Sequence, residues 1–273
     1  MNPKLKNALL PFIPPLLADA YREIRRQNRF AGRYTDWGEA LLHSTGYAKE
    51  TILQRVLDAT LLVKNGQAVY ERDSVLFEKI EYSWPLLSGL LLAAAKDGGR
   101  LRVVDVGGAL GSSYYQNKKF ISQLKSVRWS VVEQPEFAEC GRKFIADRNL
   151  RFYADLGRCL KKENPNIVLL SSILPYMEKP FAMIEQIVKS RVPFIVVDRT
   201  LFVEKGKERI VIQKVPPEIY DASYPCRIFD RDTFLTAFLK RYELLEEFDS
   251  HVGTVIRLDD TRATFKGFMF KVR

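Results

Sequence analysis

An acid, a turn rich in glycine and the start of a helix follow one another in residues 103–112, VVDVGGALGS. Asp105 comes first, and the glycines that follow it are Gly107, Gly108 and Gly111. Glycine is required where the backbone takes a positive φ or approaches a ligand closely. A helix that begins at such a turn offers free N–H groups to an electronegative ligand. The spacing therefore predicts a site for an adenine-containing cofactor at the carboxyl end of a buried strand.

Two cofactor fingerprints are close to this turn. The dinucleotide pattern G-x-G-x-x-G places its second and third glycines on Gly108 and Gly111, but its first on the β-branched Val106. The alternative, acid-x-Gly-Gly-x-x-Gly, resembles the first motif of class I S-adenosylmethionine (SAM) methyltransferases. We therefore favour SAM over NAD as the cofactor. NAD, and a glycine turn that binds no ligand, are kept as alternatives.

Two acids follow the next two predicted strands. Glu133 ends the strand at 129–132, where a carboxylate can accept hydrogen bonds from both ribose hydroxyls of an adenosyl group. Asp155 follows a strand at 151–153. The likeness to class I methyltransferases implies that Asp155 meets the adenine amino group, and the alternative is a cap for the next helix. Glu133 supports a nucleoside ligand without separating SAM from NAD.

Polar groups also follow the fourth and fifth predicted strands, beside the glycine turn. Ser171 and Ser172 leave room for an acceptor molecule, and Tyr176 would orient it or contact the sulfonium by cation–π attraction. Asp198 is the first candidate for a general base, and Arg199 would hold an acidic group of the acceptor. The simpler alternatives are ordinary packing for Tyr176 and a structural ion pair for Asp198 and Arg199.

Four further features are candidates for the same site. His251 is the rival base, because an unperturbed imidazole titrates near neutrality. His43 ranks lower than His251. Residues 70–73, Tyr-Glu-Arg-Asp, form either a polar wall of the acceptor site or a salt-bridged turn. Residues 223–225, Ser-Tyr-Pro, would fold over the acceptor as a lid.

The predicted secondary structure that positions these residues changes near residue 100, from helices to alternating strands and helices. Residues 29–98 show the apolar spacing of helices, with one at 50–63 and another from 73 or 74 to 95 that Pro85 would kink. Beyond residue 100, buried strands alternate with helices, which predicts a parallel sheet covered on both faces. The predicted strands of this part are 101–106, 129–132, 151–153, 167–171 and 194–197.

After residue 200 this alternation stops. Residues 201–230 are predicted to be a long loop insertion, followed by a helix at 231–240 and strands at 242–248 and 265–272. Two closing strands after five β-α units fit the seven-stranded class I methyltransferase sheet, whose last strand is antiparallel. We therefore predict an α/β, Rossmann-like domain at 99–273. A helical N-terminal region at 1–98 would lie on the acceptor side and could contact a second copy in a homodimer.

The composition narrows the class of protein. The chain has 273 residues, 47% of them hydrophobic, and a net charge of +10. Its charges are interspersed, so no nucleic-acid partner is expected. Three well-separated cysteines and two histidines predict a reduced, cytoplasmic protein without a metal site. The longest apolar run is too short to span a bilayer. The proline-broken opening, with a short helix at 16–26, would pack on the domain or make a peripheral contact with the inner face of the membrane.

Beyond the cofactor motif, the chain resembles a bacterial family of methyltransferases, often encoded among surface-polysaccharide (O-antigen or capsule) biosynthesis genes, whose activity is itself inferred. The shared features are residues 30–34, Trp37, 46–47, 70–73, 84–85, the glycine turn with 115–117, 171–172, 198–200 and 223–225.

This resemblance implies a cytoplasmic enzyme that transfers a methyl group from SAM to an oxygen or nitrogen atom. The implied acceptor is a small molecule or a nucleotide- or lipid-linked sugar. The catalytic histidine that plant-type O-methyltransferases carry after strand five is missing, because residues 198–200 read Asp-Arg-Thr. Two alternatives are an NAD-linked enzyme that modifies sugars and a non-catalytic SAM-fold partner of glycan enzymes.

Overall fold

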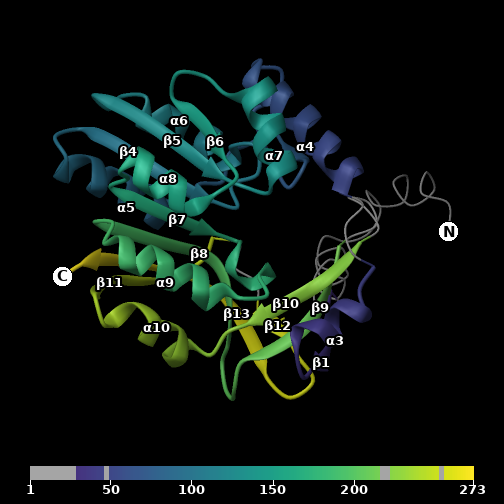
Figure 1. The fold of residues 1–273 in the computed structure, drawn as a ribbon. Coiled ribbons are helices and arrows are strands. Elements are labelled where there is room, and N and C mark those ends of the chain that lie inside the picture. Colours follow the sequence, from purple (N-terminus) through teal and green to yellow (C-terminus); the bar gives the residue numbers. More distant parts are fainter. Residues whose placement is uncertain (1–28, 46–48, 216–221, 252–254) are drawn as a thin grey trace, which may run out of the picture.

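The computed structural model describes residues 29–45, 49–215, 222–251 and 255–273 (Figure 1). The helix predicted at 16–26 and its membrane or strap contact lie outside these residues, as do residues 46–47.

A central sheet has the strand order β11-β13-β8-β7-β4-β5-β6, and β12 pairs with β13 as an eighth strand. The strands are β4 (Arg100–Val106), β5 (Ser126–Val132), β6 (Leu150–Tyr153), β7 (Ile167–Ser171), β8 (Phe194–Val203), β11 (Tyr242–Asp249), β12 (Val255–Arg257) and β13 (Arg262–Val272). β4 to β8 are parallel neighbours, whereas β13 is antiparallel to both β8 and β11. The predicted Rossmann-like sheet with an antiparallel last strand is therefore confirmed.

Helices cover both faces of this sheet (Figure 1). One face carries α4 (Lys49–Lys64), α5 (Trp84–Lys96), α6 (Ser112–Ile121) and α7 (Pro135–Cys140), and the other carries α8 (Leu156–Glu163), α9 (Pro180–Ser190) and α10 (Arg231–Leu239). Along β4, Leu101 and Val103 belong to the first core, and Val104 and Val106 to the second. This alternation follows from the two-residue period of a strand.

The N-terminal region contains strands as well as helices, so the prediction of helix throughout 29–98 is wrong in part. β2 (Tyr70–Arg72) and β3 (Val75–Phe77) form a hairpin where a helix start was expected. Asp73 and Ser74, with φ of 54° and 64°, make its turn instead of capping a helix. α5 begins only at Trp84, and Pro85 lies in its first turn, where proline causes no kink.

The predicted loop insertion at 201–230 is also wrong. β8 continues to Val203, and β9 (Arg209–Lys214) pairs on one side with β10 (Ser223–Ile228) and on the other with β1 (Phe30–Tyr34). Pro225 is tolerated because β10 is an edge strand, where a missing N–H costs no ladder bond. Residues 223–225 thus belong to a paired strand and do not form a free lid. This accessory sheet lies with α3 (Trp37–Leu42) beyond one end of the central sheet (Figure 1).

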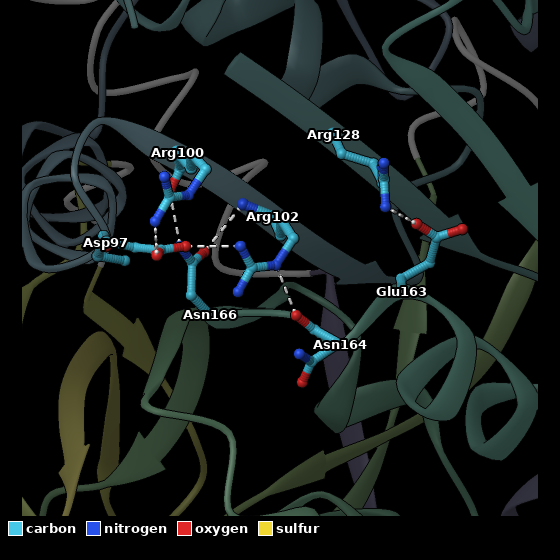
Figure 2. A network of polar contacts seen from close by, with 8 residues as sticks. Asp97, Arg100, Arg102, Arg128, Glu163, Asn164 and Asn166 are labelled. Atoms are coloured by element: carbon cyan, nitrogen blue, oxygen red, sulfur yellow. Dashed lines mark hydrogen bonds and ion pairs between the residues drawn. The ribbon is translucent and has the colours of Figure 1, made fainter. Parts of the chain in front are cut away.

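Polar contacts fix the beginnings of β4 and β7 side by side (Figure 2). Asn166 accepts a hydrogen bond from Arg102 N at 2.9 Å and donates one to Arg100 O at 2.7 Å. Asp97 pairs with Arg102 at 2.6 Å and with Arg100 at 2.9 Å. Because the two strands are parallel and in register from Val103 onward, this network also sets the positions of their opposite ends, where the candidate site lies.

Candidate functional site

The glycine turn lies at the carboxyl end of β4, and its glycine positions leave little room for side chains. Gly107 has a φ of 72°, and a Cβ there would lie 2.6 Å from the side chain of Ile173. A Cβ on Gly108 would lie 2.5 Å from a carboxylate oxygen of Asp105. Gly111, with a φ of 101°, precedes α6 as its N-cap. The three glycines therefore hold a bare backbone in front of the helix, as the sequence predicted.

The buried side chain of Asp105 packs against the glycine turn at Gly108. Its side chain is 1% exposed, and a carboxylate oxygen accepts a hydrogen bond from Trp129 Nε1 at 3.0 Å. Burial raises the pKa of Asp105 to about 7. Asp105 thus acts on the site through the position of Gly108. Its partner Trp129 carries no recognisable signal in the sequence.

Glu133 lies beside the same turn, at the end of β5. Its carboxylate accepts hydrogen bonds from Ala109 N at 3.2 Å and from Gln134 N at 2.9 Å. Burial raises the pKa of Glu133. Asp155 is exposed and accepts a hydrogen bond from Arg158 N at 2.6 Å, so it caps α8. The cap predicted as the alternative for Asp155 is thus present, and its role toward adenine stays a prediction.

A β-bulge interrupts β8 at its middle, where its pairing with β7 ends. The register with β13 shifts between Lys266 and Phe268, so that Asp198 and Arg199 together face the single residue Gly267. Arg199 takes a φ of 50°, which is uncommon for a residue other than glycine. Bulges of this kind re-aim side chains and are frequent beside active sites.

The bulge separates the two charged side chains that sequence reasoning placed together. Arg199 Nε donates to Ser171 Oγ at 3.1 Å, across to the end of β7. Asp198 is 1% exposed, and its Oδ1 accepts a hydrogen bond from Arg199 N at 2.8 Å. Ser172, with a φ of 60°, donates its N–H to the carbonyl of Asp198 at 3.0 Å. The structural ion pair considered as an alternative is absent among the described residues, since Arg199 makes no salt bridge there.

His251 comes to this site from the end of β11. Its Nε2 lies 3.3 Å from Arg72 Nη1. Because a guanidinium only donates, Nε2 must be the acceptor, so the neutral ring carries its proton on Nδ1. Burial lowers the pKa of His251, the charge of Asp198 raises it, and those of Arg199 and Arg72 lower it. The net effect lowers the pKa of His251, which favours the neutral imidazole near pH 7.

Tyr176 is directed toward the accessory sheet. It ends the short helix η3 (Leu174–Tyr176), and its hydroxyl donates to Gln213 Oε1 of β9 at 2.8 Å. Its ring packs edge-on against Tyr224 of β10 with centroids 5.2 Å apart. Burial raises the pKa of Tyr176 well above its usual value. These contacts give Tyr176 a part in holding the accessory sheet beside the site.

The β2–β3 hairpin contributes residues that were noted as a segment but not ranked as site residues. Glu71 is 1% exposed, and its carboxylate accepts hydrogen bonds from the Ser112 hydroxyl and from Ser74 N. Ser112 opens α6 directly after the glycine turn. Glu71 therefore fastens the hairpin to the turn, and Arg72 reaches His251 from the same strand. The cluster of charges beside Tyr70 was the signal that could have identified them.

The buried carboxyl of Glu71 makes the stability of the fold depend on pH. Burial raises the pKa of Glu71 from 4.5 to about 7. A carboxyl whose pKa is higher in the folded than in the unfolded state favours folding below its unfolded pKa and loses that contribution as pH rises through the folded pKa. Replacing Glu71 by neutral, isosteric Gln removes this loss.

We therefore expect the stability of Glu71→Gln relative to the native protein to rise between pH 4.5 and pH 7, by on the order of 3 kcal/mol. Urea unfolding followed by circular dichroism at several pH values measures the difference. Glu139→Gln, at an exposed position of α7, is the matched control. A difference for Glu71→Gln that is independent of pH would contradict the prediction.

No protein-family model matches the chain, and no curated protein matches it. Among solved structures, it is similar to the N-terminal domain of EvdMO1 in the presence of S-adenosylhomocysteine (SAH) and D-fucose, at 13% identity and a TM-score of 0.47, over 83% of this chain and 98% of that one. A SAM-dependent methyltransferase from Clostridium acetobutylicum has 8% identity and a TM-score of 0.45, over 70% and 92% of the two chains. The amino pentose methyltransferase CalS10 from Micromonospora echinaspora, with SAM bound, has 12% identity and a TM-score of 0.45, over 70% and 89%. Likenesses at this level assign neither a cofactor nor a substrate.

Two further observations concern the described residues alone. None of their helices has the length and apolar character needed to cross a membrane. They also contain no group of three or more His, Cys, Asp or Glu side chains that could hold a metal ion.

Proposed function

We propose that the protein is a SAM-dependent methyltransferase that acts on a small-molecule acceptor. The observation that carries this proposal is the position of Val106. It pairs with Val132 as the last residue of β4 and is buried, so the turn starts after it, at Gly107. The first glycine of a dinucleotide turn has no counterpart there, whereas the acid-x-Gly-Gly pattern coincides with the strand end and the turn.

The donor groups around the turn fit an adenosyl ligand. Glu133 would accept hydrogen bonds from the ribose hydroxyls. Its carboxylate is already positioned beside the turn, because it accepts a hydrogen bond from Ala109 N. The backbone at Gly107, Gly108 and Gly111 would border the ligand, with Asp155 near the adenine and Ser171 and Ser172 on the acceptor side. When bound, SAM supplies an electrophilic methyl group on its sulfonium.

The other residues of the site would position the acceptor and take up its proton. Methyl transfer depends largely on bringing nucleophile and methyl group into line. Because Asp198 is buried, it has little access to an acceptor, and we favour His251 as the base. Nε2 of His251 would take up the proton of the acceptor. Asp198 would stabilise the resulting imidazolium, because its negative charge raises the pKa of His251. Arg72, which contacts His251, and Arg199, which contacts Ser171, would help to hold the acceptor.

The acceptor class is a further part of the proposal. The resemblance to a family encoded among polysaccharide genes supports a nucleotide- or lipid-linked sugar, and a hydroxyl or amino group of such a sugar would receive the methyl group. The enzyme would then work in the cytoplasm, or at the inner face of the membrane where lipid-linked sugars are built.

Calorimetric titration of the purified protein with SAM, SAH and NAD tests the choice of cofactor. We expect SAM and SAH to bind at a single site and NAD to leave the heat signal at its blank value. Binding of NAD without binding of SAM would overturn the proposal and favour a sugar oxidoreductase. Absence of binding for all three would favour the non-catalytic partner of glycan enzymes.

A further inference from the structure

Arg72 and Arg199 differ from several other half-buried arginines of the described chain, because neither forms a salt bridge with a carboxylate. Arg102, Arg209 and Arg227 each form a salt bridge, at 2.6 Å to Asp97, at 2.6 Å to Asp260 and with Glu208 respectively. Arg72 and Arg199 are both half-buried and make no salt bridge with any described residue. A guanidinium that is partly withdrawn from water without a carboxylate hydrogen-bonded to it keeps unused donors, so such a pair is suited to an anionic ligand.

The two guanidinium groups lie at the same carboxyl edge of the central sheet. Arg72 follows Glu71, which is hydrogen-bonded to Ser112 directly after the glycine turn, and Arg199 Nε donates to Ser171 Oγ at the end of the neighbouring strand β7 at 3.1 Å. In agreement with this placement, both positive charges lower the pKa of His251. Arg72 comes from the β2–β3 hairpin, and Arg199 is aimed by the bulge of β8. Two elements that are distant in sequence thus direct their charges to the same space.

The present partners of Arg72 are weak acceptors that an anion would replace. Nη1 lies 3.3 Å from the neutral imidazole of His251, and the guanidinium lies 5.1 Å from the ring centroid of Phe77. A carboxylate or phosphate brings a full negative charge and can accept two parallel N–H bonds from a guanidinium, which a neutral imidazole cannot do. The nearby carboxylate of Asp198 accepts a hydrogen bond from the backbone N–H of Arg199 at Oδ1, and among the described residues it makes no salt bridge with either guanidinium.

We propose that the acceptor carries an anionic group, a carboxylate or a phosphate, which binds between Arg72 and Arg199. This inference rests on the proposed methyltransferase function and names the substrate class of its site. By drawing Arg72 away from His251, the anion also frees Nε2 of the imidazole to take the acceptor's proton. The base is thus released only when the anionic acceptor is in place.

The test uses the full chain saturated with SAH and titrated at constant ionic strength with inorganic phosphate, with glucuronate and with neutral glucose. We expect at least one anion to bind and glucose not to bind. Phosphate alone indicates a phosphate ester as acceptor, and glucuronate alone indicates a carboxylate. Arg72→Met and Arg199→Met should each weaken binding of the anion at least tenfold, while Arg158→Met, at an exposed position, leaves it unchanged.

Proton NMR of the native protein gives a second readout that requires no variant. The chain has two histidines, so His43 is an internal control. At a fixed pH near neutrality, the anion should shift the His251 ring signals toward their protonated positions, because it neutralises the arginine charges, and leave those of His43 in place.

Three results would overturn the proposal: no anion binds, both arginine variants bind it as well as the native protein does, or SAH excludes it. Exclusion by SAH would assign the arginines to the carboxylate of the cofactor. If SAH itself does not bind, the proposed function fails, whereas titration of the anions without SAH still tests the arginine pair.

Discussion

Replacement of His251 by Gln is expected to lower the rate of methyl transfer about 10²- to 10⁴-fold at neutral pH, the range typical of a lost general base. SAM affinity should stay unchanged, because His251 lies on the side of Arg72 and Asp198 and not on the glycine turn. The rate is measured with methyl-labelled SAM and with sugar phosphates and uronates as acceptors. His43→Gln is the matched control, since it changes the same residue type away from the site.

The pH dependence separates a base from a residue that only shapes the site. The native enzyme should lose activity as His251 is protonated at acidic pH, below the ordinary imidazole value of 6.5, because the pKa of His251 is lowered. His251→Gln should lose this acidic limb. Asp198→Asn should shift the limb to lower pH, because the variant lacks the negative charge that raises the pKa of His251. An unaltered pH profile in His251→Gln would exclude His251 as the base.

Replacement of Asp105 by Ala is expected to abolish SAM binding although the carboxylate has almost no exposed surface. The substitution empties the space below Gly108 and leaves the buried Trp129 N–H without its acceptor, which costs about 1–3 kcal/mol of stability. The backbone at Gly108 would then move into the cavity and lose the conformation that contacts the ligand. Calorimetry measures the affinity, and thermal unfolding checks that the fold remains.

Asp105→Asn serves as the matched control for this prediction. Asn keeps an oxygen that accepts from Trp129 Nε1 and fills nearly the same volume, so most of the SAM affinity should remain. Equal loss in Asp105→Asn and Asp105→Ala would mean that the negative charge itself is required. Unchanged affinity in Asp105→Ala would remove this residue from the site.

The central sheet could be predicted because its signals are local. The apolar run of β7 (Ile167–Ser171) has the predicted bounds, and the antiparallel β13 was expected from the two closing strands. The accessory sheet could not be predicted, because β1 pairs with β9 about 180 residues away, from Phe30 to Gln213. No local pattern records such a pairing, and the prolines near 216 and 225 favoured a loop.

In the candidate site, too, features with a local sequence signal could be predicted, whereas those that depend on distant contacts could not. Position along a strand placed Glu133 and Ser171 correctly at the carboxyl edge, but it could not show that Asp105 and Asp198 are enclosed. The contact of Arg72 with His251 joins two segments 179 residues apart. Only the folded chain could make that pair a candidate for the acceptor site and rank His251 above Asp198 as the base.

The backbone of Arg199 has a consequence for directed evolution of this protein. A side chain in the left-handed region costs about 1–2 kcal/mol that glycine avoids. A library selected only for heat resistance would therefore enrich glycine at position 199 and discard the guanidinium. Variants that are more heat-resistant but turn over more slowly would then identify the positions where catalysis requires a residue that lowers the stability of the fold.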